Sequence, residues 1–330
     1  MSERLTLRPA PFARTDATTA GIMRHVIYAT LPLVVAATWF FGPSALLVIL
    51  ASIIGAVALE WAINGRKAIA DGSGILTGLL LGLTLPPGLP LWMAFLGGAA
   101  GIGLGKLVFG GLGQNPFNPA LVGRAFLQAA FPTVLTTWSA PTESADSWFR
   151  FGEATFAIPL MHVDAVTSAT PLGLQKFEGE LTELTGLFWG NTGGSLGETC
   201  AILIILGGLY LVWKRAFDWR IPVSILGSVT VFSGIMYLAV DGHPPPQFML
   251  MSGGLLLGTI YMATDPVTSP TTPKGTWIFG IGIGALVVLI RLYGGLPEGV
   301  MYAILLMNGA TPLIERMTQP RPFGRDKAPR

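Results

Sequence analysis

The residues best suited to chemistry lie in one short polar stretch that begins at Asp164 and ends at Pro171. Proline disfavours the α region for the residue before it, so the sequence predicts an extended backbone at Thr170. Ala169 leaves room beside the Thr170 hydroxyl, and Asp164 and Thr167 add an acceptor and a second hydroxyl upstream. The stretch would therefore present a hydroxyl group on a restrained loop. The alternative is a side-chain turn that leads into a proline-fixed segment and carries no chemistry.

The order of these residues resembles the flavinylation motif Asp-x-x-Ser/Thr-Gly-Ala-Thr, whose last threonine carries FMN through a phosphoester bond. Here the motif would comprise Asp164, Thr167, Ser168, Ala169 and Thr170, with Ser168 where glycine is usual. The resemblance implies covalent FMN on Thr170. It also implies a periplasmic flavin transferase that attaches the FMN at the outer face of the membrane.

A family of membrane subunits joins this motif to a polytopic domain. It contains the D subunit of the Rnf electron-transport complex and the B subunit of the sodium-translocating NADH:quinone reductase. Four further stretches resemble the family, at 111–120, 194–199, 262–266 and 295–299. Only residues 1–24 precede the first apolar stretch, which favours the D-subunit branch.

The resemblance implies an electron-transfer subunit of a complex that couples electron flow between ferredoxin and NAD to movement of Na⁺ or H⁺. Partner subunits of that complex would hold iron–sulfur clusters and the soluble flavin. The family analogy also allows a second flavin, riboflavin, in the membrane domain. A different class of function stays open: a channel or carrier without a redox role, since the family's fold is similar to that of urea-type channels.

The composition predicts an integral membrane protein. Of 330 residues, 51% are hydrophobic and 12% are charged, and the mean hydropathy is +0.61, whereas soluble domains carry about 25% charged residues. No basic run is interleaved with aromatic residues, so we expect no nucleic-acid partner. The single cysteine, Cys200, excludes an internal disulfide. The three histidines, His25, His162 and His243, are far apart in the sequence and predict no metal site.

Ten apolar stretches approach the length of about 20 residues that a helix needs to cross a bilayer. They cover 25–42, 43–63, 73–86, 91–109, 118–137, 197–213, 219–240, 247–264, 275–293 and 296–315. The third is short because residues 86–90 include three prolines. We predict a broken or partly inserted helix there.

The placement of basic residues predicts the orientation of the chain. If ten spans alternate from a cytoplasmic N-terminus, 16 of the 20 lysines and arginines fall in inner segments, and only Arg150 and Lys176 fall in outer ones. Such a bias is typical of the positive-inside rule. We expect a multi-pass protein of a bacterial inner membrane, surrounded by lipid, with both termini cytoplasmic.

The spans and charges together predict five segments. These are a cytoplasmic N-terminal segment (1–24), a first five-helix repeat (25–137), an extracytoplasmic loop with the motif (138–196), a second five-helix repeat (197–316) and a cytoplasmic tail (317–330).

Two parts of the chain share an ordered set of features, which predicts an internal duplication. The sequence Gly-Leu-Leu-Leu-Gly at 78–82 recurs at 254–258, and each copy precedes a proline-rich break, a glycine-rich span and a Gly-Gly pair. Shared low complexity is the alternative explanation. A unit of five spans contains an odd number, so two units in series must lie with opposite topology. We therefore expect an all-α polytopic membrane protein of about ten transmembrane helices, in two inverted five-helix repeats with broken third helices.

Three further residues are candidates for contacts with a cofactor. Asn118 precedes Pro119 at the start of a span, a position equally typical of a helix cap. Arg124 lies two turns into that span, where an arginine needs an anionic or carbonyl partner, either in the fold or on a cofactor phosphate. Asp265 ends the eighth span and would either cap the next segment or lie at the break between the halves.

Three glutamates lie at membrane level in the predicted topology. Glu60 falls inside the second span, whereas Glu198 and Glu298 fall at the starts of the sixth and tenth. Carboxylates are favoured at helix N-termini, and the sequence predicts a capping or other structural role for each of these glutamates.

Overall fold

The computed structural model describes residues 18–65, 70–141, 151, 154–159, 168–190 and 192–320. Within these ranges every regular element is a helix, which confirms the predicted all-α class. The motif residues Asp164 and Thr167 lie outside the described ranges, whereas Ser168, Ala169 and Thr170 lie inside them.

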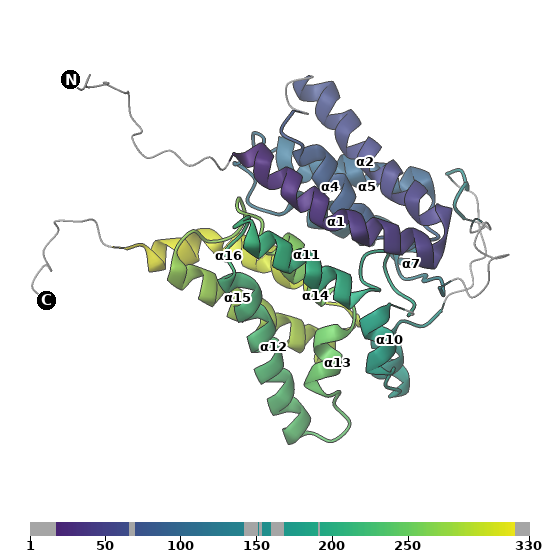
Figure 1. Ribbon diagram of the computed structural model, residues 1–330, viewed down its shortest axis with the longest axis vertical. Coiled ribbons are helices and arrows are strands. Elements are labelled where there is room, and N and C mark those ends of the chain that lie inside the picture. The colour runs from purple at the N-terminus through teal and green to yellow at the C-terminus, as the bar shows by residue number, and fades with distance from the viewer. Residues whose placement is uncertain are drawn as a thin grey trace, which may run out of the picture.

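Helices of the first half lie together on one side of the molecule (Figure 1). They are α1 (Thr19–Phe41), α2 (Pro43–Asn64), α4 (Ser73–Leu83), α5 (Leu91–Ile102) with a π-helical turn η1 (Gly103–Leu107), α6 (Pro119–Ala130) and α7 (Pro132–Leu135). The connecting segment contributes α9 (Pro171–Gly173), a π-helical turn η2 (Leu174–Glu178) and α10 (Leu184–Trp189).

Helices of the second half form the other side of the molecule (Figure 1). They are α11 (Ala201–Trp213), α12 (Arg220–Ala239), α13 (Pro246–Met251), α14 (Leu255–Leu257) with a π-helical turn η3 (Gly258–Met262), α15 (Pro273–Tyr293) and α16 (Val300–Thr318). Each of the ten predicted stretches thus coincides with one helix or with consecutive helical segments.

The lengths of the helices fit a protein that crosses the membrane several times. In the described part of the chain four helices, α1, α2, α12 and α15, are long and apolar enough to span a bilayer. Three more apolar helical segments are shorter, at Ser73–Leu83, Leu91–Leu107 and Ala201–Trp213. The chain is therefore a multi-pass membrane protein in which some of the helices are short or interrupted.

The third helix of each half is interrupted, as predicted. In the first half, α4 is only 11 residues long and follows Gly72, whose φ of 77° is left-handed. In the second half, the chain breaks between α13 and α14 at residues 252–254, where Gly253 has a φ of 62°. The prolines of segment 265–270 had predicted the second break only after this span. Glycine tolerates the left-handed conformation that lets the chain turn at both places.

Equivalent helices pack in equivalent ways, which supports the duplication. In the first half α2 packs along α5, and in the second α12 packs along α15. Gly98 of α5 lies so close to the Ser52 carbonyl that no Cβ would fit, and Gly280 of α15 lies equally close to Ser224. Small residues at such crossings let membrane helices approach each other closely.

The first helices of the two halves, α1 and α11, lie side by side and run in opposite directions (Figure 1). His25, near the start of α1, lies 2.8 Å from the hydroxyl of Tyr210, near the end of α11. Near the end of α1, Phe40 lies close to Gly190, which precedes α11. The antiparallel pairing agrees with the predicted inverted topology.

Candidate cofactor site

Thr170 adopts the extended backbone that its position before Pro171 predicts, with φ −78° and ψ 155°. Its Oγ1 accepts a hydrogen bond of 3.1 Å from the backbone N–H of Gly173 and so caps α9. The Thr170 residue is half-buried, and Ala169 beside it is exposed. The hydroxyl is therefore held in place by the backbone, with open space on the Ala169 side.

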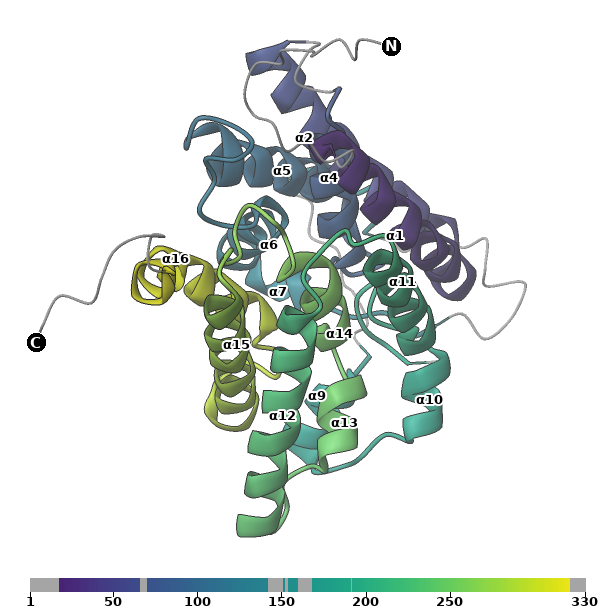
Figure 2. The same cartoon turned by 60° about the vertical axis from the view of Figure 1, so that its left-hand side comes forward.

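The segment on both sides of Thr170 is anchored to other parts of the fold. Ser168 donates to the Trp138 carbonyl through its backbone N–H at 2.7 Å and its hydroxyl at 3.2 Å. Leu172 is buried in a small apolar cluster with Leu187 of α10 and Phe248 of α13. Helices α9, α10 and α13, which carry these three residues, lie together at one end of the molecule (Figure 2). The segment around Thr170 is therefore held in a fixed position against the rest of the fold.

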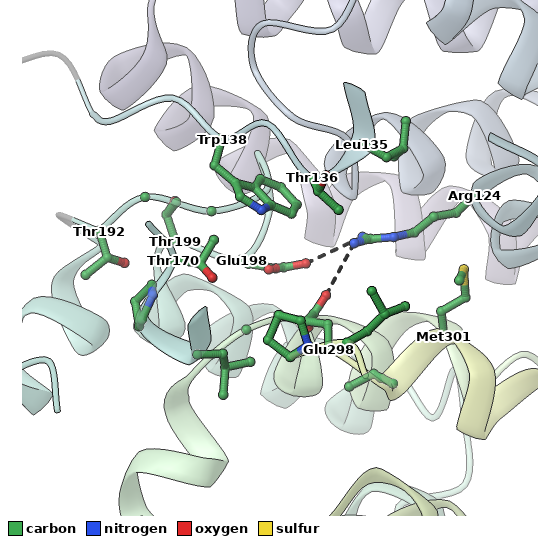
Figure 3. A pocket seen from close by; sticks show the side chains of 18 of the residues that line it. Arg124, Leu135, Thr136, Trp138, Thr170, Thr192, Glu198, Thr199, Glu298 and Met301 are labelled. Carbon is green, nitrogen blue, oxygen red and sulfur yellow. Dashed lines mark hydrogen bonds and ion pairs between the residues drawn. The ribbon is translucent and has the colours of Figure 1, made fainter. Parts of the chain in front are cut away.

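Thr170 lines an open hollow, which we call the Thr170 cavity and which measures about 860 Å³ together with the open space at its mouth. The wall is built from α6, α7, α9, the segment 192–199 and the start of α16 (Figure 3). Apolar and polar side chains share the lining, including Trp138, Thr192 and Tyr302. Arg124 and the carboxylates of Glu198 and Glu298 also line the cavity, so a charged cluster borders the space beside the hydroxyl.

Arg124 is buried and bridges the two halves of the protein. Its Nη1 donates to the Thr84 carbonyl at 2.7 Å and lies 3.6 Å from Oε1 of Glu198. Its Nη2 lies 3.3 Å from Oε2 of Glu298 (Figure 3). The sequence required an anionic or carbonyl partner for this arginine, and the fold itself supplies both kinds.

The two glutamates have structural roles, which the sequence allowed beside capping. Helix α11 begins at Ala201 and α16 at Val300, so neither Glu198 nor Glu298 is an N-cap residue. Glu298 instead accepts a hydrogen bond of 2.5 Å from the backbone N–H of Gly254, in the break of the third span. Burial beside Arg124 outweighs a capping role because an isolated charge is costly away from water.

Arg291 is a second buried arginine at this end of the molecule, and the sequence assigned it no function. Its Nη1 donates to the Met249 carbonyl at 2.6 Å and its Nη2 to the Ser252 carbonyl at 2.9 Å. These carbonyls belong to the end of α13, where the break before α14 begins. Arg291 therefore satisfies backbone oxygens that the interrupted helix leaves free.

Lys176 connects the Thr170 loop to the second half. Its ammonium donates to the carbonyls of Arg291 at 2.9 Å, Gly294 at 2.5 Å and Leu296 at 3.1 Å. Burial lowers the pKa of Lys176, whereas the three carbonyl oxygens favour its charged form. In the sequence this residue was only one of two basic residues in outer segments, so the charge count gave no sign of its contacts.

Asn118 and Asp265 lie elsewhere, beside a second cavity of about 660 Å³ that we call the Lys106 cavity. Residues from the start of α1 line this cavity, whereas the end of α1 lies near Gly190 and the Thr170 cavity. A helix of 23 residues is about 34 Å long. The two cavities therefore lie toward opposite ends of the bundle.

The residues of the Lys106 cavity hold its two walls together. Asn118 caps α6, one of the two roles that the sequence allowed, accepting from Ala120 N–H at 3.0 Å, and it donates to the Met262 carbonyl at 3.1 Å. Asp265 accepts from Val267 N–H at 3.3 Å, which is the local capping role that the sequence allowed. Both contacts are structural, yet both side chains remain part of the cavity lining.

Lys106 is buried at this end and forms an ion pair with Glu60. Its ammonium also donates to the hydroxyl of Ser73 at 2.6 Å. The charge count treated Lys106 as an inner-segment residue, but the structure encloses it within the protein. It ends the fourth span of the first half, as Arg291 does in the second, and each cation contacts residues at the start of a broken third helix.

Known proteins are similar in sequence to this chain over nearly its whole length. Residues 6–324 match the model of the NQR2, RnfD, RnfE family. The chain belongs to this family.

Among the described residues no group of three or more His, Cys, Asp and Glu side chains is arranged to hold a metal ion.

Three relatives show how closely the chain follows this family. It is 44% identical to the D subunit of the proton-translocating ferredoxin:NAD(+) oxidoreductase complex of Clostridium ljungdahlii, over 97% of this chain and 96% of the relative. It is 43% identical to the D subunit of the ion-translocating oxidoreductase complex of Stutzerimonas stutzeri, over 92% of each. It is 42% identical to the D subunit of the Na(+)-translocating ferredoxin:NAD(+) oxidoreductase complex of Acetobacterium woodii, over 97% and 95%.

Proposed function

We propose that this chain is the D subunit of an ion-translocating ferredoxin:NAD oxidoreductase complex of the Rnf type, and that Thr170 carries FMN through a phosphoester bond. Relatives that match along nearly their whole length are named as D subunits of such complexes. The observation that carries the flavin proposal is the Thr170 hydroxyl. It belongs to the last residue of the motif and lies beside a cavity of about 860 Å³.

The residues around Thr170 fit a tethered flavin. The Thr170 hydroxyl has one backbone donor, Gly173 N–H, and a phosphoester would leave an oxygen at the same position to accept it. Ala169 is exposed, so a transferase could reach the loop. Flavin chemistry belongs to the cofactor, which carries electrons when bound, whereas the protein supplies attachment, orientation and electrostatics. A covalent tether keeps the flavin from dissociating.

The charged cluster beside the cavity is compatible with an anionic cofactor because its charges balance one another. The two arginines, Arg124 and Arg291, balance the two carboxylates of Glu198 and Glu298 when all four are ionised. Arg124 forms ion pairs with both carboxylates. The cluster would thus fix the floor of the cavity without adding net charge to it.

The proposed orientation places the Thr170 cavity at the periplasmic face of a bacterial inner membrane, with both termini in the cytoplasm. The excess of basic residues in the opposite segments supports this orientation. A periplasmic flavin transferase would then act on Thr170. Partner subunits would supply the iron–sulfur clusters and the other flavins of the complex. One named relative belongs to a proton-translocating complex and is 44% identical, and another belongs to a sodium-translocating complex and is 42% identical. Overall identity therefore does not decide which of the two ions the complex of this chain would move.

A second flavin, riboflavin, has a suitable place in the Lys106 cavity. Asn118 and Asp265 come from different halves of the chain and line that one space. Hydroxyl and amide groups in the lining, such as Thr77 and Asn115, could bind the ribityl chain of a neutral flavin. The competing function, a channel or carrier with no redox role, would use the same cavities as an entrance and an exit.

The experiment that tests the flavin proposal compares two threonines of one cavity. Denatured wild-type protein, from cells that contain the transferase, should fluoresce on a gel under ultraviolet light. The Thr170→Val variant should be dark, whereas Thr192→Val, which changes a threonine in the same lining, should fluoresce. A fluorescent Thr170→Val band would move the attachment elsewhere, and a dark wild type would favour the channel.

A further inference from the structure

The two halves differ at one place where duplication would make them alike. In the first half α2 packs closely along α4, because Gly78 and Gly82 of α4 lie directly against Ile53 and Ile49 of α2. In the second half the equivalent pair, α12 and the broken third helix (α13, α14 and η3), packs less closely, and α11 and α12 diverge from the loop that joins them (Figure 2). The space between α11, α12 and the broken helix forms an apolar groove.

The groove measures about 870 Å³ together with the open space at its mouth, and only apolar residues line it. They are Ile205, Gly208, Leu209, Val212, Phe217, Pro222, Leu226, Leu250, Met251, Leu256 and Ile260. Leu209 is 61% exposed and Val212 is 40% exposed, so the groove opens to the side of the bundle. In a membrane this opening faces hydrocarbon.

One end of the groove carries basic and aromatic residues. The chain from Val212 to Phe217, both lining residues, includes Lys214 and Arg215. Among the described residues no carboxylate lies within ion-pair distance of these two cations. Trp213 is 73% exposed, and the ammonium of Lys214 lies 4.3 Å from the centroid of its ring. Tryptophan together with lysine or arginine is typical of the headgroup level of a membrane.

We propose that this groove binds an acyl chain of an anionic phospholipid, whose phosphate lies against Lys214 and Arg215. Basic residues between membrane helices bind anionic headgroups, and the purely apolar lining suits a hydrocarbon chain rather than a polar ligand. A helix of a partner subunit would fill the apolar space, but it would give no role to two cations without carboxylate partners at the mouth.

The bound lipid would also complete a wall of the Lys106 cavity. Phe217 and Ile260 line both the groove and that cavity, so they form the partition between them. An acyl chain in the groove would support this partition from the membrane side. The lipid would then replace, in the second half, the contact that α2 and α4 make in the first. This inference stands independently of the flavin proposal.

Photo-crosslinking in the native complex tests which molecule occupies the groove. The photoreactive residue p-benzoylphenylalanine would replace Leu209 in the groove or, as a control, Val35 of α1, which is 70% exposed. After illumination, mass spectrometry of the purified subunit should show phospholipid adducts at Leu209. The ratio of phosphatidylglycerol to phosphatidylethanolamine should be higher in these adducts than in those at Val35. Adducts to another subunit, or no lipid adduct at Leu209, would overturn the proposal.

A charge variant tests the recognition of the headgroup. One basic residue near an anionic surface contributes about fivefold in binding, so Lys214→Gln with Arg215→Gln should reduce the phosphatidylglycerol enrichment at Leu209 by up to about thirtyfold. The matched control, Lys274→Gln with Arg316→Gln, removes two exposed basic residues from α15 and α16 and should leave the enrichment unchanged. Equal enrichment in both variants, or an unenriched wild type, would overturn the assignment of the headgroup.

Discussion

Arg124 in the first half of the chain forms a part-buried ion pair with Glu298 in the second, with 3.3 Å between Nη2 and Oε2. The residues are 174 positions apart in the sequence. The same arginine reaches Glu198 at 3.6 Å and the Thr84 carbonyl at 2.7 Å. One side chain therefore connects the two repeats beside the space that Thr170 lines.

Removing this arginine should destabilise the whole fold. Arg124→Ala leaves two carboxylates without their ion-pair partner, and breaking a buried pair in this way costs about 3–5 kcal/mol. We expect a lower unfolding temperature and a lower yield of the purified complex. Arg220→Ala is the control, because its ion pair with Asp218 is about one-third exposed and contributes at most about 1 kcal/mol. Equal losses from both variants would contradict the role given to Arg124.

Lys176 should hold the Thr170 loop in place. Lys176→Met keeps the apolar stem but removes three hydrogen bonds to the carbonyls of Arg291, Gly294 and Leu296. We expect faster proteolysis within residues 168–190 and less flavin on Thr170, while the bundle stays folded. Lys176→Arg should preserve most of both properties because it keeps the charge and several donors. Flavin content that is unchanged in Lys176→Met would show that the loop does not need this anchor.

Close packing of α12 on α15 should depend on the glycine at their crossing. A Cβ at Gly280 would overlap the Ser224 hydroxyl, so Gly280→Val should cost about 1–3 kcal/mol or more through overpacking. Gly227 of α12 serves as the control because a Cβ added there would meet no atom within 4 Å. Thermal unfolding should separate Gly280→Val from Gly227→Val. A tolerated Gly280→Val would mean that the helices can move apart.

Asn118 combines a helix cap with a contact between the halves, and two substitutions separate these roles. Asn118→Ser keeps a capping oxygen but loses the donor to the Met262 carbonyl, whereas Asn118→Ala loses both. We expect a loss of about 1 kcal/mol in the stability of Asn118→Ala relative to Asn118→Ser, the usual value of a cap. Both variants should release non-covalent flavin if riboflavin occupies the Lys106 cavity. Retention of that flavin in both would argue against the proposed place.

Much of the architecture could be predicted because hydrophobic length and charge bias act locally along the chain. The span that ends at Trp213 and the extended backbone at Thr170 both follow from neighbouring residues. The position of the second break, at Gly253, was not predicted, because a Gly-Gly pair inside an apolar run is also common where membrane helices pack closely together. The partners of Arg124 and Lys176 lie 40 or more residues away in the sequence, and local patterns carry no information about such contacts.

The most direct test of the account is the mass of the peptide that contains Thr170, taken from the complex purified out of its native membrane. We predict that this peptide carries the mass of a phosphoester-linked FMN and that fragmentation assigns the added mass to Thr170. An unmodified peptide from an active complex would show that Thr170 does not carry FMN.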